Sequence, residues 1–138
     1  VWITYRVRTG RYSNIDVSNR LQRKSLYYFA ESCMMIYLIY FYWKTHLIDF
    51  VMLFILILLL ALHLSNNYIK SSMHTAYNVL VAALFFNLTW KMGLLWLLIS
   101  ALVGFTRIKL KRHTLSEVLL GAGIALFVSF FYLYFSAV

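Results

Sequence analysis

Proline is absent from the 138-residue chain, and charged residues make up only 12% of it. Without proline, no helix needs to be kinked at a proline ring. The charged fraction is about half of the roughly 25% that is usual in soluble domains, which indicates a membrane protein. A lone cysteine, Cys33, excludes a disulfide within the chain. Carboxylates occur only at Asp16, Glu31, Asp49 and Glu117, too few for a conventional two-metal hydrolytic site.

Hydrophobic residues make up 63% of the chain, and the mean hydropathy is +0.77. They form five apolar runs, at 26–43, 47–64, 75–90, 92–105 and 115–137. A membrane-spanning helix needs about 20 apolar residues, and about 17 are tolerated. The second and fifth runs meet this length well, whereas the third and fourth are short. Open strands cannot cross lipid, and the alternating pattern of a barrel is missing. We therefore predict an all-α, multi-pass transmembrane helix bundle with at least five spans in 26–138, preceded by a basic loop or interfacial segment in 1–25.

Three short polar segments interrupt the apolar pattern, at 16–24, 71–75 and 106–117. Two apolar runs lie between each segment and the next, so an even number of crossings returns the chain to the same face of the membrane. We therefore predict that the three segments converge on one face. All but Lys44 and Lys91 of the 13 lysines and arginines lie there. The positive-inside rule makes this face cytoplasmic, although cations that bind an anionic ligand weaken that inference.

The formal net charge of +9 indicates phosphate ligands, anionic headgroups or topology signals. Nucleic acid is a poor alternative partner, because the basic residues are not part of a soluble domain. Histidines and arginines gathered at membrane boundaries favour a site for a lipid phosphate. Because the chain begins at Val1 and not at a methionine, we expect it to be a piece of a longer protein.

The third polar segment resembles the third motif of the type 2 phosphatidic acid phosphatase superfamily, a family of integral membrane lipid phosphatases. That motif is Ser-Arg, five residues, His, three residues, Asp. The chain has Arg107, His113 and Glu117 at this spacing, with Thr106 in place of the serine. The change from Asp to Glu117 and the change from Ser to Thr106 are chemically mild.

Two further segments are similar to the other motifs of the family, in the family's order. Ser71-Ser72-Met73-His74-Thr75 is similar to the second motif, Pro-Ser-Gly-His-Thr. Residues 16–23 are similar to the basic first motif in a divergent form, although no proline follows Arg20 or Arg23. Met73 is the largest departure, since it places a side chain where the family brings bare backbone near phosphate.

The resemblance implies a mechanism through a phosphohistidine. His113 would be the nucleophile, and Glu117 would bind its other ring nitrogen and hold the tautomer. His74 would protonate the leaving alkoxide. The phosphate-binding residues would be Arg20, Arg23, Ser72 and Arg107. Phosphoryl transfer needs mainly positioning and charge neutralisation, so we expect no metal and no cofactor.

Some of the same residues also have purely structural interpretations. Ser72 has the position of a helix N-cap, and Thr114 with Glu117 matches a capping box. Glu31 lies within the first apolar run, where a carboxylate is a functional candidate by default, but it could instead pair with a nearby cation. His63, at the end of a run, is expected at the interface.

The sequence thus predicts a metal-independent phosphatase of the membrane that hydrolyses a lipid phosphomonoester or pyrophosphate. The candidate substrates are a polyprenyl pyrophosphate such as undecaprenyl pyrophosphate, phosphatidate and phosphatidylglycerophosphate. The small size of the core favours the polyprenyl substrate, and we expect a bacterial inner membrane as the location. Two alternatives stay open: a lipid-linked phosphotransferase of the same family, and a non-catalytic membrane protein that binds lipid phosphates.

Overall fold

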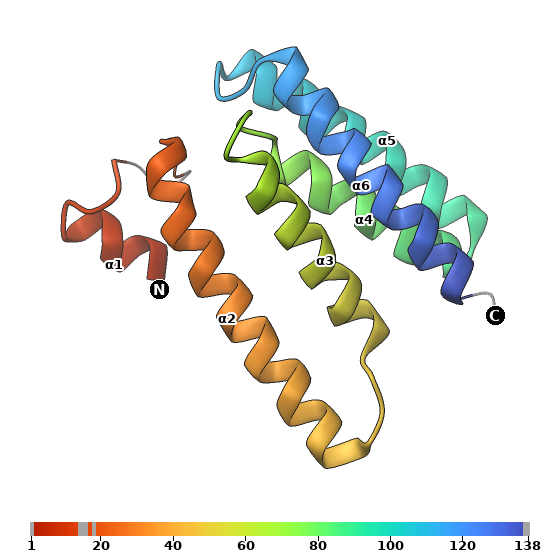
Figure 1. Ribbon diagram of the computed structural model, residues 1–138. Coiled ribbons are helices and arrows are strands. Elements are labelled where there is room, and N and C mark those ends of the chain that lie inside the picture. The colour runs from red at the N-terminus through yellow and green to blue at the C-terminus, as the bar shows by residue number, and fades with distance from the viewer. Residues whose placement is uncertain (1, 14–16, 18, 137–138) are drawn as a thin grey trace.

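The computed structural model describes residues 2–13, 17 and 19–136, and the side chain of Arg20 lies outside the described part. These residues form six helices and no strand (Figure 1). The helices are α1 (Trp2–Arg8), α2 (Arg20–Thr45), α3 (Phe50–Ser65), α4 (Met73–Leu88), α5 (Trp90–Lys109) and α6 (Leu115–Ser136). The all-α prediction is therefore confirmed over the described residues.

Polar side chains cap the helices at their N-termini. The side chain of Asn19 accepts a hydrogen bond from the amide of Leu21 at the start of α2, and Asp49 accepts one from the amide of Met52 at the start of α3. Such caps satisfy amides that have no partner within the helix. Thr89 both ends α4 and begins α5, so these two apolar helices are joined by a single residue.

Two of the helices, α5 with 20 residues and α6 with 22, are long and apolar enough to cross a membrane, judged by length and composition. The expectation that the second apolar run reaches this length is wrong. Its helix, α3, has 16 residues, because Asp49 caps the helix and delays its start to Phe50. The fourth run, in contrast, gives a longer helix than expected, since α5 continues through Thr106 to Lys109.

Helix α4 occupies the middle of the bundle. It packs against α5 on one side and α6 on another, and α3 packs against α6, α4 and α2 (Figure 1). The central apolar cluster includes Leu58, Leu59 and Leu62 of α3, Leu80 of α4 and Ala125 of α6. Because these side chains come from helices distant in sequence, the cluster joins α3, α4 and α6 into one body.

Helix α2 attaches to this body along a polar stripe. Its buried side chains are Arg23, Tyr27 and Glu31, which follow one another at intervals of four and therefore share a helix face. Most of the apolar side chains further along α2 are exposed, including Ile36, Ile39 and Trp43. Helix α1 is held against α2 by Trp2, whose ring stacks on Phe29 with the ring centroids 4.4 Å apart.

The three polar segments meet at one end of the bundle. Figure 1 shows the start of α2, the loop between α3 and α4 and the loop between α5 and α6 at the same end. Side chain contacts join all three: Arg23 donates to the carbonyl of Ser71 at 2.9 Å and lies 3.4 Å from a ring nitrogen of His113. The predicted convergence is therefore confirmed for the described residues, whereas Asp16 lies outside them.

Candidate functional site

His113 and Glu117 form a close pair at the start of α6. Nδ1 of His113 lies 2.8 Å from Oε2 of Glu117. The two residues are four apart, which puts them on one helix face, but His113 itself lies in the loop just before the helix. Its ring is almost completely buried, so the imidazole has a single fixed orientation.

A capping box holds the carboxylate of this pair in place. The amide of Thr114 donates to Oε2 of Glu117 at 3.2 Å, and the hydroxyl of Thr114 accepts from the amide of Glu117 at 3.3 Å. The structural interpretation of these two residues is therefore confirmed. Glu117 has a second task, since the same oxygen also binds His113.

Ser72 ties the second polar segment to the third. Its amide donates to the carbonyl of Glu117 at 3.0 Å, and its hydroxyl caps α4 by accepting from the amide of Thr75. A side chain at Gly121 would prevent this approach, because its Cβ would lie 2.7 Å from the carbonyl oxygen of Ser72. The N-cap interpretation of Ser72 is thus confirmed, and its hydroxyl is fully buried.

Arg23 is the residue of the first segment that reaches the pair. Its Nε donates to the carbonyl of Val17 at 3.1 Å, its Nη1 to the carbonyl of Ser71 at 2.9 Å, and its Nη2 lies 3.4 Å from Nε2 of His113. A guanidinium only donates hydrogen bonds. Nε2 of His113 therefore carries the lone pair, and Nδ1 carries the proton that Glu117 accepts.

The electrostatic surroundings keep His113 neutral. Burial lowers the pKa of His113 from 6.5 to about 4, and the positive charges of Arg23 and Lys70 act in the same direction. The hydrogen bond to Glu117 opposes this shift but does not outweigh the loss of solvation. A neutral imidazole with its lone pair on Nε2 is the form of histidine that can act as a nucleophile.

A polar pocket of about 390 Å³ opens beside this pair. It is lined by Lys70, Ile108, Lys111, Arg112, His113, Thr114 and Glu117. Lys70 also donates from Nζ to the carbonyl of Arg112 at 3.0 Å. Burial and the nearby arginines lower the pKa of Lys70, which indicates that positive charge is concentrated here. An anion entering the pocket would relieve this repulsion.

A second pocket, of about 430 Å³, is lined in part by Arg23. Its walls include Arg23, Met73, His74 and Asn78. The exposed His74 is the second residue of α4, after Met73, so His74 comes from a helix and His113 from the loop before α6. Met73 contributes to the wall of this pocket, which is where its side chain affects what can enter.

The two remaining predicted phosphate ligands are Arg107 and Arg20. Arg107, in the last turn of α5, is half-buried and lies within electrostatic range of Arg23 and Lys70. Its carbonyl accepts from the amides of Arg112 and His113, so it shapes the loop that carries His113. For Arg20, only the backbone at the start of α2 is described, and its role stays a prediction.

Two features of the site were missed by sequence reasoning. Lys70 lines the polar pocket although it precedes the second motif; its position directly before that motif was the available signal. Glu31 pairs with a histidine and not with a lysine or arginine: its Oε1 lies 2.8 Å from Nδ1 of His63. The pairing joins α2 to α3 and depends on tertiary packing, which no spacing along the chain reveals.

Among the described residues, no group of three or more His, Cys, Asp or Glu side chains is arranged to hold a metal ion. In comparisons with known proteins, no family model, no curated protein sequence and no solved structure matches the chain.

Proposed function

We propose that the protein is a metal-independent membrane phosphatase that hydrolyses a lipid phosphomonoester or pyrophosphate. The observation that supports this most is the orientation of His113: Nδ1 is held by Glu117, and the lone pair of Nε2 faces the guanidinium of Arg23. A nucleophile, an orienting carboxylate and a phosphate-binding cation are then in contact. This is the set of groups that nucleophilic phosphoryl transfer requires.

In the first step, Nε2 of His113 attacks the phosphorus atom. The bond from phosphorus to the lipid oxygen breaks, its electron pair goes to that oxygen, and His74 in its protonated form supplies the proton. Arg23 and Lys70 are the cations beside His113 that can stabilise the charge of the phosphoryl oxygens. The Glu117 carboxylate stabilises the positive ring that forms on His113.

In the second step, water attacks the phosphorus of the phosphohistidine. The bond between phosphorus and Nε2 breaks, and its electron pair returns to the ring of His113. The neutral His74 accepts the proton of the water, and inorganic phosphate leaves. Both histidines thereby regain the states in which they began, so the cycle needs only lipid phosphate and water.

The location follows from the same proposal. Helices α2 to α6 would cross a bacterial inner membrane as a five-span bundle, with the site at one membrane surface. Helices α3 and α4 have 16 residues each, which at 1.5 Å per residue span about 24 Å, less than the roughly 30 Å of a typical hydrocarbon core. We expect the bilayer to thin around these two helices.

The test is phosphate release in detergent, with chelator present, from a polyprenyl pyrophosphate, phosphatidate and phosphatidylglycerophosphate. We expect the parent protein to release phosphate and His113→Asn to lose about 10⁶-fold in rate, as loss of the nucleophile of a catalytic triad does. His46→Asn is the matched control, because His46 is exposed at the far end of α2. Equal activity of the parent and His113→Asn would refute the mechanism.

Two other outcomes identify the alternatives. Phosphate transfer that depends on an added acceptor alcohol would indicate a phosphotransferase, with the same phosphohistidine as intermediate. Specific binding of lipid phosphate without release would indicate a binding protein, and Met73→Gly would then be examined, since Met73 lines the pocket of His74 and Arg23.

A further inference from the structure

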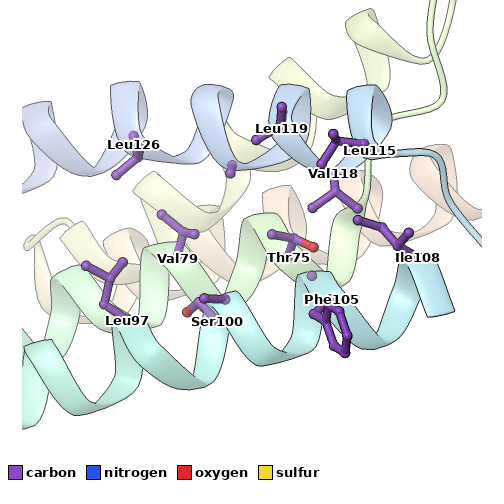
Figure 2. A pocket seen from close by; sticks show the side chains of 13 residues that line it. Thr75, Val79, Leu97, Ser100, Phe105, Ile108, Leu115, Val118, Leu119 and Leu126 are labelled. Atoms are coloured by element: carbon purple, nitrogen blue, oxygen red, sulfur yellow. The ribbon is translucent and has the colours of Figure 1, made fainter.

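An apolar groove runs along the bundle below the candidate site. It has a volume of about 420 Å³ and lies between α4, α5 and α6. Figure 2 shows Thr75 and Val79 of α4, Leu97 and Phe105 of α5, and Leu126 of α6 around this space. The groove exists because α4 packs closely against both neighbours, whereas α5 and α6 contact each other much less.

The walls of the groove are almost entirely apolar. The polar side chains among its lining residues are Thr75 and Ser100, and both residues are buried. The hydroxyl of Thr75 lies 3.0 Å from that of Ser72, and the hydroxyl of Ser100 donates to the carbonyl of Trp96 at 2.8 Å. Since both hydroxyls are buried and already have a partner in the protein, an occupant gains little from polar groups. The groove therefore fits a hydrocarbon.

The upper end of the groove borders the polar pocket that contains His113. Ile108 lines both spaces. At the start of α6, Thr114 and Glu117 face the polar pocket, while their neighbours Leu115 and Val118 line the groove (Figure 2). An occupant that passes Ile108 would place an anionic end among the cations and an apolar end along the helices.

The dimensions suit a single lipid chain. From Ile108 to Leu97 the groove follows 11 residues of α5, which corresponds to about 16 Å along a helix. This is about half of a typical hydrocarbon core of roughly 30 Å. A chain anchored by its phosphate at the membrane surface would reach the middle of the bilayer.

We propose that this groove binds one hydrocarbon chain of the phosphate-bearing lipid and thereby selects substrates by chain length. The proposal rests on the proposed function for the identity of the headgroup. An acyl chain and a prenyl chain are both apolar and would use the same walls. Selection follows because a longer chain contacts more of the groove, until Leu97 and Leu126 at its lower end are reached.

Two neighbouring residues of α6 provide a matched pair of variants. Ala122 lines the groove, so Ala122→Phe fills part of it. Gly123 is not one of the residues that line the groove, and a Cβ added there meets no atom within 4 Å. Gly123→Phe therefore adds the same ring outside the groove. Comparing the two separates loss of the groove from the general effect of a new aromatic ring on α6.

The first measurement is phosphate release from alkyl phosphates of increasing length and from farnesyl phosphate. For the parent and Gly123→Phe, we expect kcat/KM to rise with chain length. For Ala122→Phe, we expect about a tenfold loss with hexadecyl phosphate and no loss with octyl phosphate, a size typical of discrimination in apolar pockets. A higher kcat/KM for the long alkyl phosphates than for farnesyl phosphate indicates an acyl chain, and a higher kcat/KM for farnesyl phosphate indicates a prenyl chain. An unchanged length dependence in Ala122→Phe would overturn the proposal.

The second measurement does not need turnover. A hexadecyl phosphate with a photoreactive diazirine in the middle of its chain is crosslinked to the protein, and the labelled residues are mapped. We expect labelling around Val79 and Ala122 that Ala122→Phe abolishes and Gly123→Phe retains. Such labelling without phosphate release would refute the proposed phosphatase function but would still support binding of a hydrocarbon chain in the groove. Labelling spread evenly over the outer faces of α5 and α6 would refute the groove.

Discussion

The described residues include two histidine–carboxylate pairs with the same central geometry and different surroundings. In both pairs, Nδ1 of the histidine lies 2.8 Å from a carboxylate oxygen. His113 and Glu117 lie at the start of one helix, and the second ring nitrogen of His113 faces Arg23. His63 and Glu31 come from α3 and α2, and the ring of His63 is stacked on Tyr27 and approached edge-on by Tyr28.

This difference teaches that the pair alone does not indicate chemistry. Tyr27 covers one face of the His63 ring with a centroid distance of 4.9 Å, and no pocket described above is lined by His63 or Glu31. Helix α2 has few other buried side chains, so the pair of His63 and Glu31 is a main connection between α2 and α3. We interpret it as structural and the pair of His113 and Glu117 as catalytic.

The largest expected effect separates the two carboxylates by activity. Glu117→Gln keeps the capping box, because glutamine also serves at that position, but it no longer holds His113 in the required tautomer. We expect kcat to fall about 10⁴-fold, as it does when the orienting carboxylate of a catalytic triad becomes an amide. Glu31→Gln should keep kcat within about twofold, measured by phosphate release in detergent. Comparable losses in both variants would end the distinction.

The next effect separates the two histidines by stability. His63→Ala leaves the buried Glu31 without its partner, which we expect to cost about 3 kcal/mol. His113→Ala should cost less, since Glu117 still binds the amide of Thr114. The measurement is the unfolding free energy in detergent from a denaturant titration. Replacing Glu31 and His63 together by leucine should recover most of the loss, and a double variant as unstable as His63→Ala would contradict a structural pair.

A smaller effect is expected where a backbone contact supports His113 and Glu117, the proposed catalytic pair. Gly121→Ala places a Cβ 2.7 Å from the carbonyl oxygen of Ser72, so α4 must move away from α6 at a cost of about 2 kcal/mol. The amide of Ser72 then loses contact with the carbonyl of Glu117 and kcat falls as well. Gly123→Ala, which has open space, is the control. Equal stability of both alanine variants would show that the approach is not tight.

Sequence reasoning performed well where local chemistry decides the outcome. The spacing of His113 and Glu117, the capping box and the cap at Ser72 all follow from residues within one turn of each other, and the structure contains them. Predicting that the polar segments converge required only the count of two apolar runs between each segment and the next. These predictions need no knowledge of which helices touch.

It performed less well where caps or tertiary contacts decide. The apolar run at 47–64 begins before Asp49, but the cap starts α3 at Phe50, so hydrophobicity overestimated the helix. Helix α5 extends into the third polar segment because lysine and arginine are good helix formers. The contact of Glu31 with His63 is made by packing between segments, and no pattern along the chain encodes it. Lys70 reaches the polar pocket through packing as well, although its position directly before the second motif was a signal.

The pH dependence of stability sharpens the comparison further. The folded protein lowers the pKa of His113 from 6.5 to about 4, so the unfolded chain takes up this proton at higher pH. The unfolding free energy should therefore decrease as the pH falls from about 6.5 towards 4. Thermal unfolding of the parent across this range measures the slope. His113→Asn should remove this contribution and His63→Asn should retain it; a slope unchanged by His113→Asn would contradict the assignment.

The smallest expected effect concerns the cation that sequence reasoning overlooked. Lys70 helps to lower the pKa of His113 through its charge, so Lys70→Gln should raise that pKa and move the acid limb of the kcat/KM profile, which reports the free enzyme, to higher pH. Lys111→Gln is the control, because Lys111 lines the same pocket but is not among the charges that shift His113. A merely structural role for Lys70 would change stability and leave the limb in place. A shift of the acid limb to higher pH in Lys70→Gln would therefore show that the charge of the polar pocket sets the pKa of the proposed nucleophile, and an unmoved limb would show that it does not.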